Sequence, residues 1–205
     1  MESKVDERIE LEYFKIGSSC GGSQSWMFDP VMRAGGCAAL TTCDIFIYLA
    51  LYRGKSNLIP EIKKLTRREY RDFAATMKPY LHPRSTGIKA LKTYMDGVRA
   101  YLSDIGDSSI TLRGVEGYEA YEVARNAIKC SIDGKVPVAY LMLRHKNRDF
   151  QEFDWHWFTV IGYGYKNEEF YIKVATYGES HWLPLKELWD TGFSEKGGIV
   201  LFDID

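Results

Sequence analysis

Residues 35–44 read Gly-Gly-Cys-Ala-Ala-Leu-Thr-Thr-Cys-Asp, and an apolar run continues from them to Leu51. Apolar side chains in this run recur three and four positions apart, which predicts a buried helix that begins at Cys37. A thiol in the first turn of a helix lies near the positive end of the helix dipole, which favours the thiolate. The two glycines before it leave open backbone where a substrate could approach the sulfur. The sequence therefore predicts that Cys37 is an activated nucleophile.

The composition predicts one globular domain that spans residues 1–205. The chain has 205 residues, 45% of them hydrophobic and 14% aromatic, which is enough for one sizeable core. Its formal net charge is −1, so it has no basic surplus to neutralise phosphates, and we expect no nucleic-acid partner. The N-terminus has no signal-like apolar region, and the longest apolar runs are too short to span a bilayer. We therefore expect a cytoplasmic protein without a membrane partner, and the sequence leaves its oligomeric state open.

The four cysteines are expected to be free thiols in a reducing compartment, since no pair has the spacing of a zinc or redox motif. We expect Cys43 and Cys130 to be small buried hydrophobes. Cys20 is a rival nucleophile, but no apolar helix follows it directly. A metal site made of Cys37, Cys43 and a histidine is a weaker alternative, and we expect neither a metal nor another cofactor.

The apolar patterns predict helices in the first half of the chain and strands in the second. After the helix that begins at Cys37, helices are expected over residues 59–65, 67–77, 88–102 and 119–130, and one helical turn over residues 185–189. Strands are expected over residues 10–16, 110–113, 136–143, 155–163, 169–176, 181–184 and 198–202. Thr66 and Glu69 have the spacing of a capping box, and residues 17–36 are expected to form a long loop. This order predicts an α+β fold, with a helical N-terminal half packed on an antiparallel β-sheet from the C-terminal half.

A thiol nucleophile needs a base, and His156 is the best-placed histidine in the sequence. It lies between Trp155 and Trp157, at the start of an apolar strand. His82 lies between two prolines and His145 lies among charged residues, so we expect both of them to face solvent. We therefore interpret His156 as the partner of the nucleophile.

Three short motifs follow one another along the chain: Gly36-Cys37-Ala38-Ala39, Gly134-Lys135-Val136-Pro137-Val138 and His156-Trp157-Phe158-Thr159-Val160-Ile161-Gly162-Tyr163. A cysteine that begins a helix, followed much later by a histidine that begins a strand, resembles the papain-like cysteine peptidases. Within that clan the motifs are most similar to the double-glycine, or bacteriocin-leader, peptidases. The resemblance implies a papain-like fold and a thiol protease or related hydrolase. Such an enzyme cleaves a peptide, amide or thioester bond through an acyl-enzyme intermediate, with a peptide or small amide as substrate.

The resemblance also implies a role for each site residue. Cys37 would attack the carbonyl carbon, and His156 would hold the thiol proton and pass it to the leaving group. Gln24 would donate its amide to the oxyanion together with the backbone N–H of Cys37, although an inserted loop over residues 27–35 separates it from the cysteine. The family expects Asn or Asp as a third member, but the register through Tyr177-Gly178 puts Ala175 at that place. Thr176 and Asp154 are the alternatives for orienting the imidazole.

Two other interpretations stay open from the sequence. Because Ala175 replaces the expected Asn or Asp, the chain could be a catalytically weak relative that binds peptides, and a thiol pKa near its ordinary value would favour this interpretation. In the other interpretation, Cys37 and His156 are unrelated in space and the chain is a simple α+β domain. Seven aromatic residues are candidates either for a cleft or for the core: Trp26, Phe28, Tyr80, Trp155, Trp157, Tyr177 and Trp182.

Overall fold

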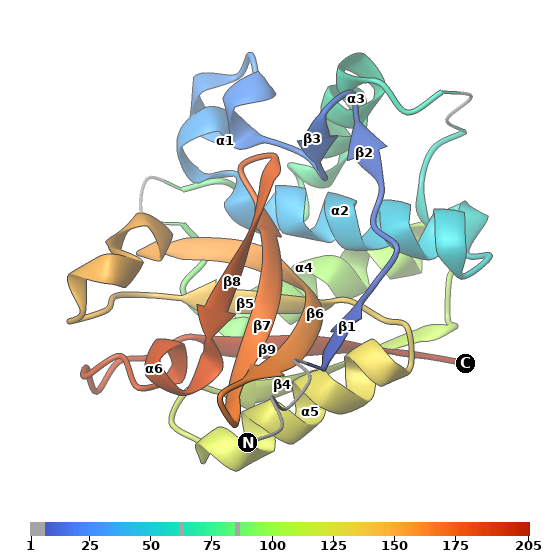
Figure 1. The fold of residues 1–205 in the computed structure, drawn as a ribbon. Coiled ribbons are helices and arrows are strands. Elements are labelled where there is room, and N and C mark those ends of the chain that lie inside the picture. Colours follow the sequence, from blue (N-terminus) through green and yellow to red (C-terminus); the bar gives the residue numbers. More distant parts are fainter. Residues whose placement is uncertain (1–6, 62–63, 85–86) are drawn as a thin grey trace.

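The computed structural model describes residues 7–61, 64–84 and 87–205. Most of the helices come in the first half of the chain and most of the long strands in the second half, as labelled in Figure 1. They are β1 (Arg8–Glu10), β2 (Lys15–Ile16), β3 (Ser19–Cys20), the 3₁₀ helix η1 (Gln24–Trp26), α1 (Pro30–Gly35), α2 (Cys37–Tyr52), η2 (Ser56–Leu58), α3 (Arg67–Met77), α4 (Leu91–Asp104), β4 (Ile110–Glu116), α5 (Tyr121–Asp133), β5 (Val138–Met142), η3 (Arg148–Phe153), β6 (His156–Lys166), β7 (Glu169–Thr176), β8 (Glu179–Pro184), α6 (Leu185–Trp189) and β9 (Gly198–Ile204).

The main sheet has seven strands and is antiparallel at every pairing. Its order is β4-β9-β5-β6-β7-β8, and β1 pairs separately with β6. The long strand β6 is shared, because β5 pairs with its first half, from His156 to Val160, and β1 pairs with its second half, from Gly162 to Gly164. A separate two-stranded sheet joins β2 to β3. The expected α+β class with an antiparallel sheet is confirmed.

Helix α2 is the central element of the fold. In Figure 1 it crosses the middle of the molecule, between α1, α3 and the β2–β3 sheet on one side and the main sheet on the other. It packs against β5, β6 and α3, and each of its residues from Cys37 to Leu49 is buried. A helix surrounded in this way is apolar on all its faces, which explains why the sequence shows a nearly continuous apolar run there.

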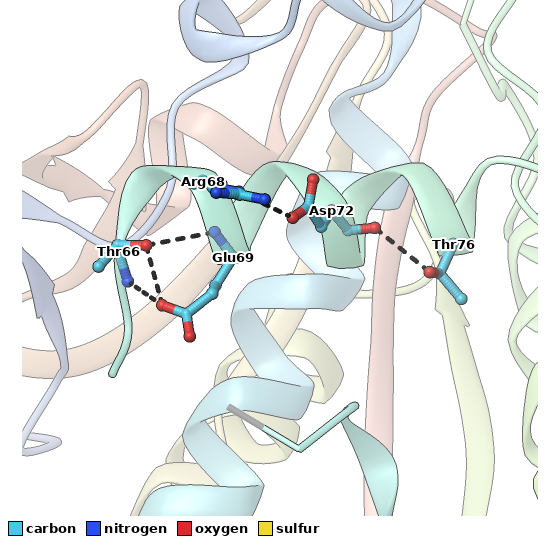
Figure 2. A network of polar contacts seen from close by, with 5 residues as sticks. All are labelled: Thr66, Arg68, Glu69, Asp72 and Thr76. Carbon is cyan, nitrogen blue, oxygen red and sulfur yellow. Dashed lines mark hydrogen bonds and ion pairs between the residues drawn. The ribbon is translucent and has the colours of Figure 1, made fainter. Parts of the chain in front are cut away.

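The predicted helix over residues 67–77 is present as α3, and its capping box is confirmed. Thr66 Oγ1 accepts a hydrogen bond from the Glu69 backbone N–H at 3.3 Å, and Glu69 Oε2 accepts one from the Thr66 N–H at 3.1 Å (Figure 2). These bonds satisfy N–H groups that have no partner inside the helix. On the exposed side, Arg68 forms an ion pair with Asp72 at 3.9 Å, and Thr76 donates to the Asp72 carbonyl at 3.2 Å.

Three predicted elements are wrong in part. Residues 17–36 are not one long loop, because they contain β3, η1 and α1. Helix α1 forms since Asp29 caps it by accepting from the Val31 N–H at 2.9 Å, and Pro30 is preorganised for the first helical position. The predicted strand over residues 10–16 is instead two short strands, β1 and β2, with an irregular segment between them.

The predicted helix over residues 59–65 is also wrong where the structure describes it. A single 3₁₀ turn, η2, precedes this segment, and residues 59–61 and 64–65 are not helical, while residues 62 and 63 lie outside the described residues. Pro60 disfavours the helical conformation at the residue before it, which explains why no helix begins at Ile59. The other predicted helices and strands are present, with ends that differ by up to three residues. No helix in the described part of the chain is long and apolar enough to cross a bilayer.

Candidate active site

Cys37 is the first residue of α2, as the sequence predicts, and it directly follows α1. Gly36 ends α1 and also precedes α2, so one residue separates the two helices just before the thiol. Gly35 lines the same cleft as Cys37, and both glycines are also closely packed by backbone. A Cβ atom at Gly35 would collide with the Arg84 carbonyl, and one at Gly36 would collide with the Met32 carbonyl. These two residues are therefore glycine because other backbone segments pack directly against them.

The thiol of Cys37 is buried, with 5% of the residue exposed. Burial raises its pKa above the ordinary value, and the nearby backbone N–H groups of Trp157 and Ala38 only partly oppose this effect. The prediction of a lowered thiol pKa from the helix dipole is therefore wrong. The desolvation of the sulfur outweighs the nearby backbone N–H groups, so the resting group is a neutral thiol at neutral pH.

His156 is the first residue of β6 and lies opposite Met142 of β5. It is buried, and burial lowers the pKa of its imidazole to about 4. Its Nε2 atom lies 2.6 Å from the Thr176 hydroxyl oxygen, which fixes the orientation of the ring. The ring of Tyr177 stacks on the imidazole, with 4.4 Å between the ring centres and 9° between the planes. The imidazole is therefore neutral at pH 7 and held on two sides.

The third position of the site is occupied by a threonine. Ala175 pairs with Thr159 in the sheet and offers no polar side chain, whereas Thr176 ends β7 beside the imidazole. Asp154, the other predicted alternative, accepts a hydrogen bond from the His145 backbone N–H at 2.9 Å and not from the imidazole. The hydroxyl of Thr176 is thus the group that orients His156.

Tyr177 is placed over His156 by the turn between β7 and β8. Tyr177 and Gly178 both have positive φ angles, 53° and 83°, which is the conformation of a two-residue turn that matches the twist of a hairpin. The Gly178 carbonyl accepts from the Cys20 N–H at 2.8 Å, so the turn is attached to β3. In Figure 1 this turn lies next to α1 and the start of α2. Tyr177 is 47% exposed, so its ring separates the imidazole from solvent at the mouth of the site.

Cys37, His156, Gln24 and Tyr177 line two adjoining cavities. The outer cleft has a volume of about 430 Å³, and Arg33 and Trp155 lie along its walls. The inner cavity, of about 20 Å³, extends from the thiol and the imidazole to Asp44. Among the residues that the structure describes, no hydrogen bond joins the Cys37 thiol to the imidazole, so the two groups face one cleft without being bonded to each other.

Gln24 is the predicted oxyanion donor, and it lies in η1 at the edge of both cavities. Its Nε2 atom donates to the Arg33 carbonyl at 2.8 Å, which leaves the second N–H of the amide for another acceptor. The inserted segment between Gln24 and Cys37 is not a loop but mainly the helix α1. The helix brings the chain back to the cleft that Gln24 lines, and its Arg33 carbonyl accepts the hydrogen bond that fixes the glutamine amide.

Several other predictions concern residues outside the site. Cys20 lies in β3 and does not line either cavity within the described part of the chain. Cys43 is buried as expected, but Cys130 is exposed because it lies on the outer side of α5. His82 is exposed as expected, whereas His145 is buried and its Nε2 lies 2.9 Å from the Glu187 carbonyl oxygen.

Of the seven aromatic candidates, three line the cavities: Trp155, Trp157 and Tyr177.

One buried carboxylate of the inner cavity was not predicted. Asp44 of α2 accepts hydrogen bonds from the hydroxyls of Tyr70 at 2.7 Å and Tyr13 at 3.2 Å, and from the Gly22 N–H at 3.1 Å. Burial raises its pKa to about 6 in spite of these donors. The signal in the sequence was an acidic residue in an apolar helix, seven positions after Cys37 and therefore on the same face.

Among the described residues, no group of three or more histidine, cysteine or acidic side chains is arranged to hold a metal ion. A scan against protein-family models finds no matching family, and a search of curated proteins finds no matching protein.

Proposed function

We propose that the protein is a papain-like cysteine hydrolase that cleaves a peptide, amide or thioester bond through an acyl-enzyme intermediate. The observation that carries the proposal is that Cys37, His156 and Gln24, which belong to three different elements, line one cleft. The fold supports it, because the nucleophile begins a central helix and the base begins a strand of the antiparallel sheet that packs on it.

The contact with Thr176 is compatible with the proton positions that the reaction needs. If Nε2 of His156 carries its proton and donates it to the Thr176 oxygen, then Nδ1 is the unprotonated nitrogen and can accept a proton. Cys37 Sγ attacks the carbonyl carbon while its proton passes to Nδ1, and the carbonyl π electrons move to the oxygen. The tetrahedral intermediate then collapses, the bond to the leaving amine or thiol breaks, and the imidazolium returns its proton to that leaving group. A water molecule hydrolyses the thioester with His156 as base, which regenerates the thiol.

The pKa values indicate how the thiol is activated. The pKa of Cys37 is raised and the pKa of His156 is lowered to about 4, so the resting pair is a neutral thiol and a neutral imidazole. The imidazole therefore acts as a general base during the attack, rather than as the partner of a resting thiolate. Thr176 is neutral and stabilises an imidazolium less than a carboxylate does, so we expect slow turnover.

Two donors are available for the oxyanion. The backbone N–H of Cys37 belongs to the first turn of α2, where N–H groups have no partner inside the helix. Gln24 lines the same cavities, and the second N–H of its amide is the other proposed donor. Preorganised donors at this position stabilise charge only as it develops in the transition state, which is the largest contribution in many acyl-transfer enzymes.

A second candidate function is a binding module for peptides. It is favoured by one observation, the burial of the Cys37 thiol, which raises its pKa above the ordinary value. In this function the outer cleft would bind an extended segment against Trp155 and Tyr177 without cleaving it.

The two functions are separated by acylation of the thiol. We expect a thioester or activated ester to acylate Cys37 in the wild-type protein, and Cys37→Ala and His156→Gln to abolish that reaction. Cys130 is exposed and reacts by itself, so each variant is made in a Cys130→Ser background, and the modified residue is identified by mass spectrometry. Acylation that is unchanged in Cys37→Ala refutes the hydrolase. Peptide binding without acylation supports the binding module.

A further inference from the structure

Asp44 is a buried carboxylate that the proposed reaction does not use. It lies on α2, two turns after Cys37, and forms part of the wall of the inner cavity. Removing a carboxylate from water costs several kcal/mol unless donors replace the lost hydration. Three donors do so here: the hydroxyls of Tyr13 and Tyr70 and the backbone N–H of Gly22. Three separate segments of the chain therefore meet at this side chain.

The segment that contains Gly22 can approach the carboxylate only because it lacks side chains. A Cβ atom at Gly21 would collide with the Asp44 carboxylate, and one at Gly22 would collide with the ring of Tyr70. Gly21 also has a φ angle of 69°, which glycine adopts without strain. The backbone over residues 21–22 is thus held tightly between α2 and α3.

Gln24 follows this anchored backbone after one intervening residue. Its amide is fixed on the other side by the Arg33 carbonyl, at 2.8 Å. Because Asp44 and Cys37 belong to one continuous helix, the hydrogen bond that the Gly22 N–H donates to Asp44 connects the segment containing Gln24 to the helix that carries the thiol. We propose that Asp44 is a positioning residue that holds the Gln24 amide at the oxyanion position. This inference rests on the proposed function of Cys37.

Two reactions of the same thiol distinguish positioning of Gln24 from a general role in folding. Acylation by an activated ester forms the S–C bond at a carbonyl carbon, passes through an oxyanion and releases the alcohol or phenol. Alkylation by iodoacetamide forms the S–C bond at a saturated carbon and releases iodide, so it needs no oxyanion donor. A residue that positions Gln24 therefore affects acylation and spares alkylation.

The test compares both rates in the Cys130→Ser background, with Asp44→Asn as the variant. We expect acylation to fall about tenfold or more while alkylation stays within about twofold of the parent. Gln24→Ala should show the same split, and the double variant should lose little beyond Gln24→Ala alone, because both changes act on one donor. Thr42→Val is the matched control, since Thr42 is a buried polar residue of α2 that bonds the Tyr94 hydroxyl instead, and it should change neither rate.

Four outcomes overturn the inference. They are an Asp44→Asn variant with both rates unchanged, one with both rates lowered equally, a double variant whose losses multiply, and a split of the same size in Thr42→Val. If Asp44→Asn does not fold, Tyr70→Phe removes one donor from the carboxylate while keeping the ring, and it should give a smaller split in the same direction. A parent protein that alkylates but never acylates refutes the proposed function itself, and the Asp44 inference falls with it.

Discussion

Two buried groups in the site, His156 and Asp44, titrate with opposite effects on stability. Burial lowers the pKa of His156 to about 4 from an ordinary value of 6.5, and it raises the pKa of Asp44 to about 6 from 3.8. Between about pH 4 and 6, folding therefore releases protons from the histidine and takes up protons at the aspartate. We predict that these two contributions largely cancel in the wild-type protein and separate in single variants.

The sign of each contribution follows from proton linkage. The native state binds fewer protons at His156 than the unfolded state does. The stabilising contribution of His156 to the free energy of unfolding is therefore fully present above pH 6.5 and is lost as the pH falls through 4. The native state binds more proton at Asp44, so that contribution is fully present below pH 3.8 and is lost as the pH rises through 6. At 1.36 kcal/mol per pKa unit, each amounts to about 3 kcal/mol.

The variants Asp44→Asn and His156→Gln each remove one of the two titrations. Relative to wild type, Asp44→Asn should lose about 2 to 3 kcal/mol of unfolding free energy between about pH 6.5 and 4. His156→Gln should gain a similar amount over the same range. Both variants also carry a constant offset from lost contacts, so the informative quantity is the slope of the difference curve against pH.

Urea unfolding followed by tryptophan fluorescence gives the free energy at each pH, provided that the slope with denaturant stays constant. Taking the difference from wild type removes the contributions of carboxyls that titrate equally in all three proteins, such as Asp29 and Asp133. Difference curves that are flat with pH for both variants would refute the assigned pKa shifts. A Thr42→Val protein, which changes no titratable group, should run parallel to wild type.

Three further predictions concern single side chains. Thr176→Val removes the partner of His156 Nε2 and should slow acylation of Cys37 about tenfold or more in stopped-flow measurements, whereas Thr176→Ser should restore most of the rate. Because burial raises the pKa of Cys37, alkylation in the Cys130→Ser background should still be rising at about pH 8.5. A plateau in weakly acidic solution would instead indicate a resting thiolate. Thr66→Ala breaks the capping box of α3 and should lower the unfolding free energy by about 1 kcal/mol with an unchanged denaturant slope, and an unaltered midpoint would contradict this role.

Much of the fold could be predicted because local patterns and tertiary packing agree. The helix that begins at Cys37, the capped helix after Thr66 and the strand 169–176 are present where the sequence indicates them. The segment 17–36 was mispredicted because glycine and serine suggest a loop, whereas Asp29 and Pro30 start a short helix that composition alone does not reveal. Local sequence signals are sufficient to predict a helix or strand only where the segment determines its own structure.

The sequence indicates four residues that the structure brings to one cavity, Gln24, Cys37, His156 and Thr176, but it does not indicate their electrostatics. Helix position suggests a thiolate at Cys37, but the burial that reverses this effect depends on how the sheet packs over the helix. The role of Asp44 depends on three segments that meet only in the folded chain. His145 was expected at the surface because its neighbours are charged, and its burial results from a contact with the distant residue Glu187. Each of these properties arises from long-range contacts.

Helix α1 spans most of the segment between Gln24 and Cys37 and holds both of its ends. Its start is capped by Asp29, and its last turn leads directly into α2 through Gly36. The Arg33 carbonyl, within α1, bonds the Gln24 side chain. The segment between the two residues therefore does two things at once: it leads the chain into the helix that carries Cys37, and it supplies the carbonyl that fixes the Gln24 amide.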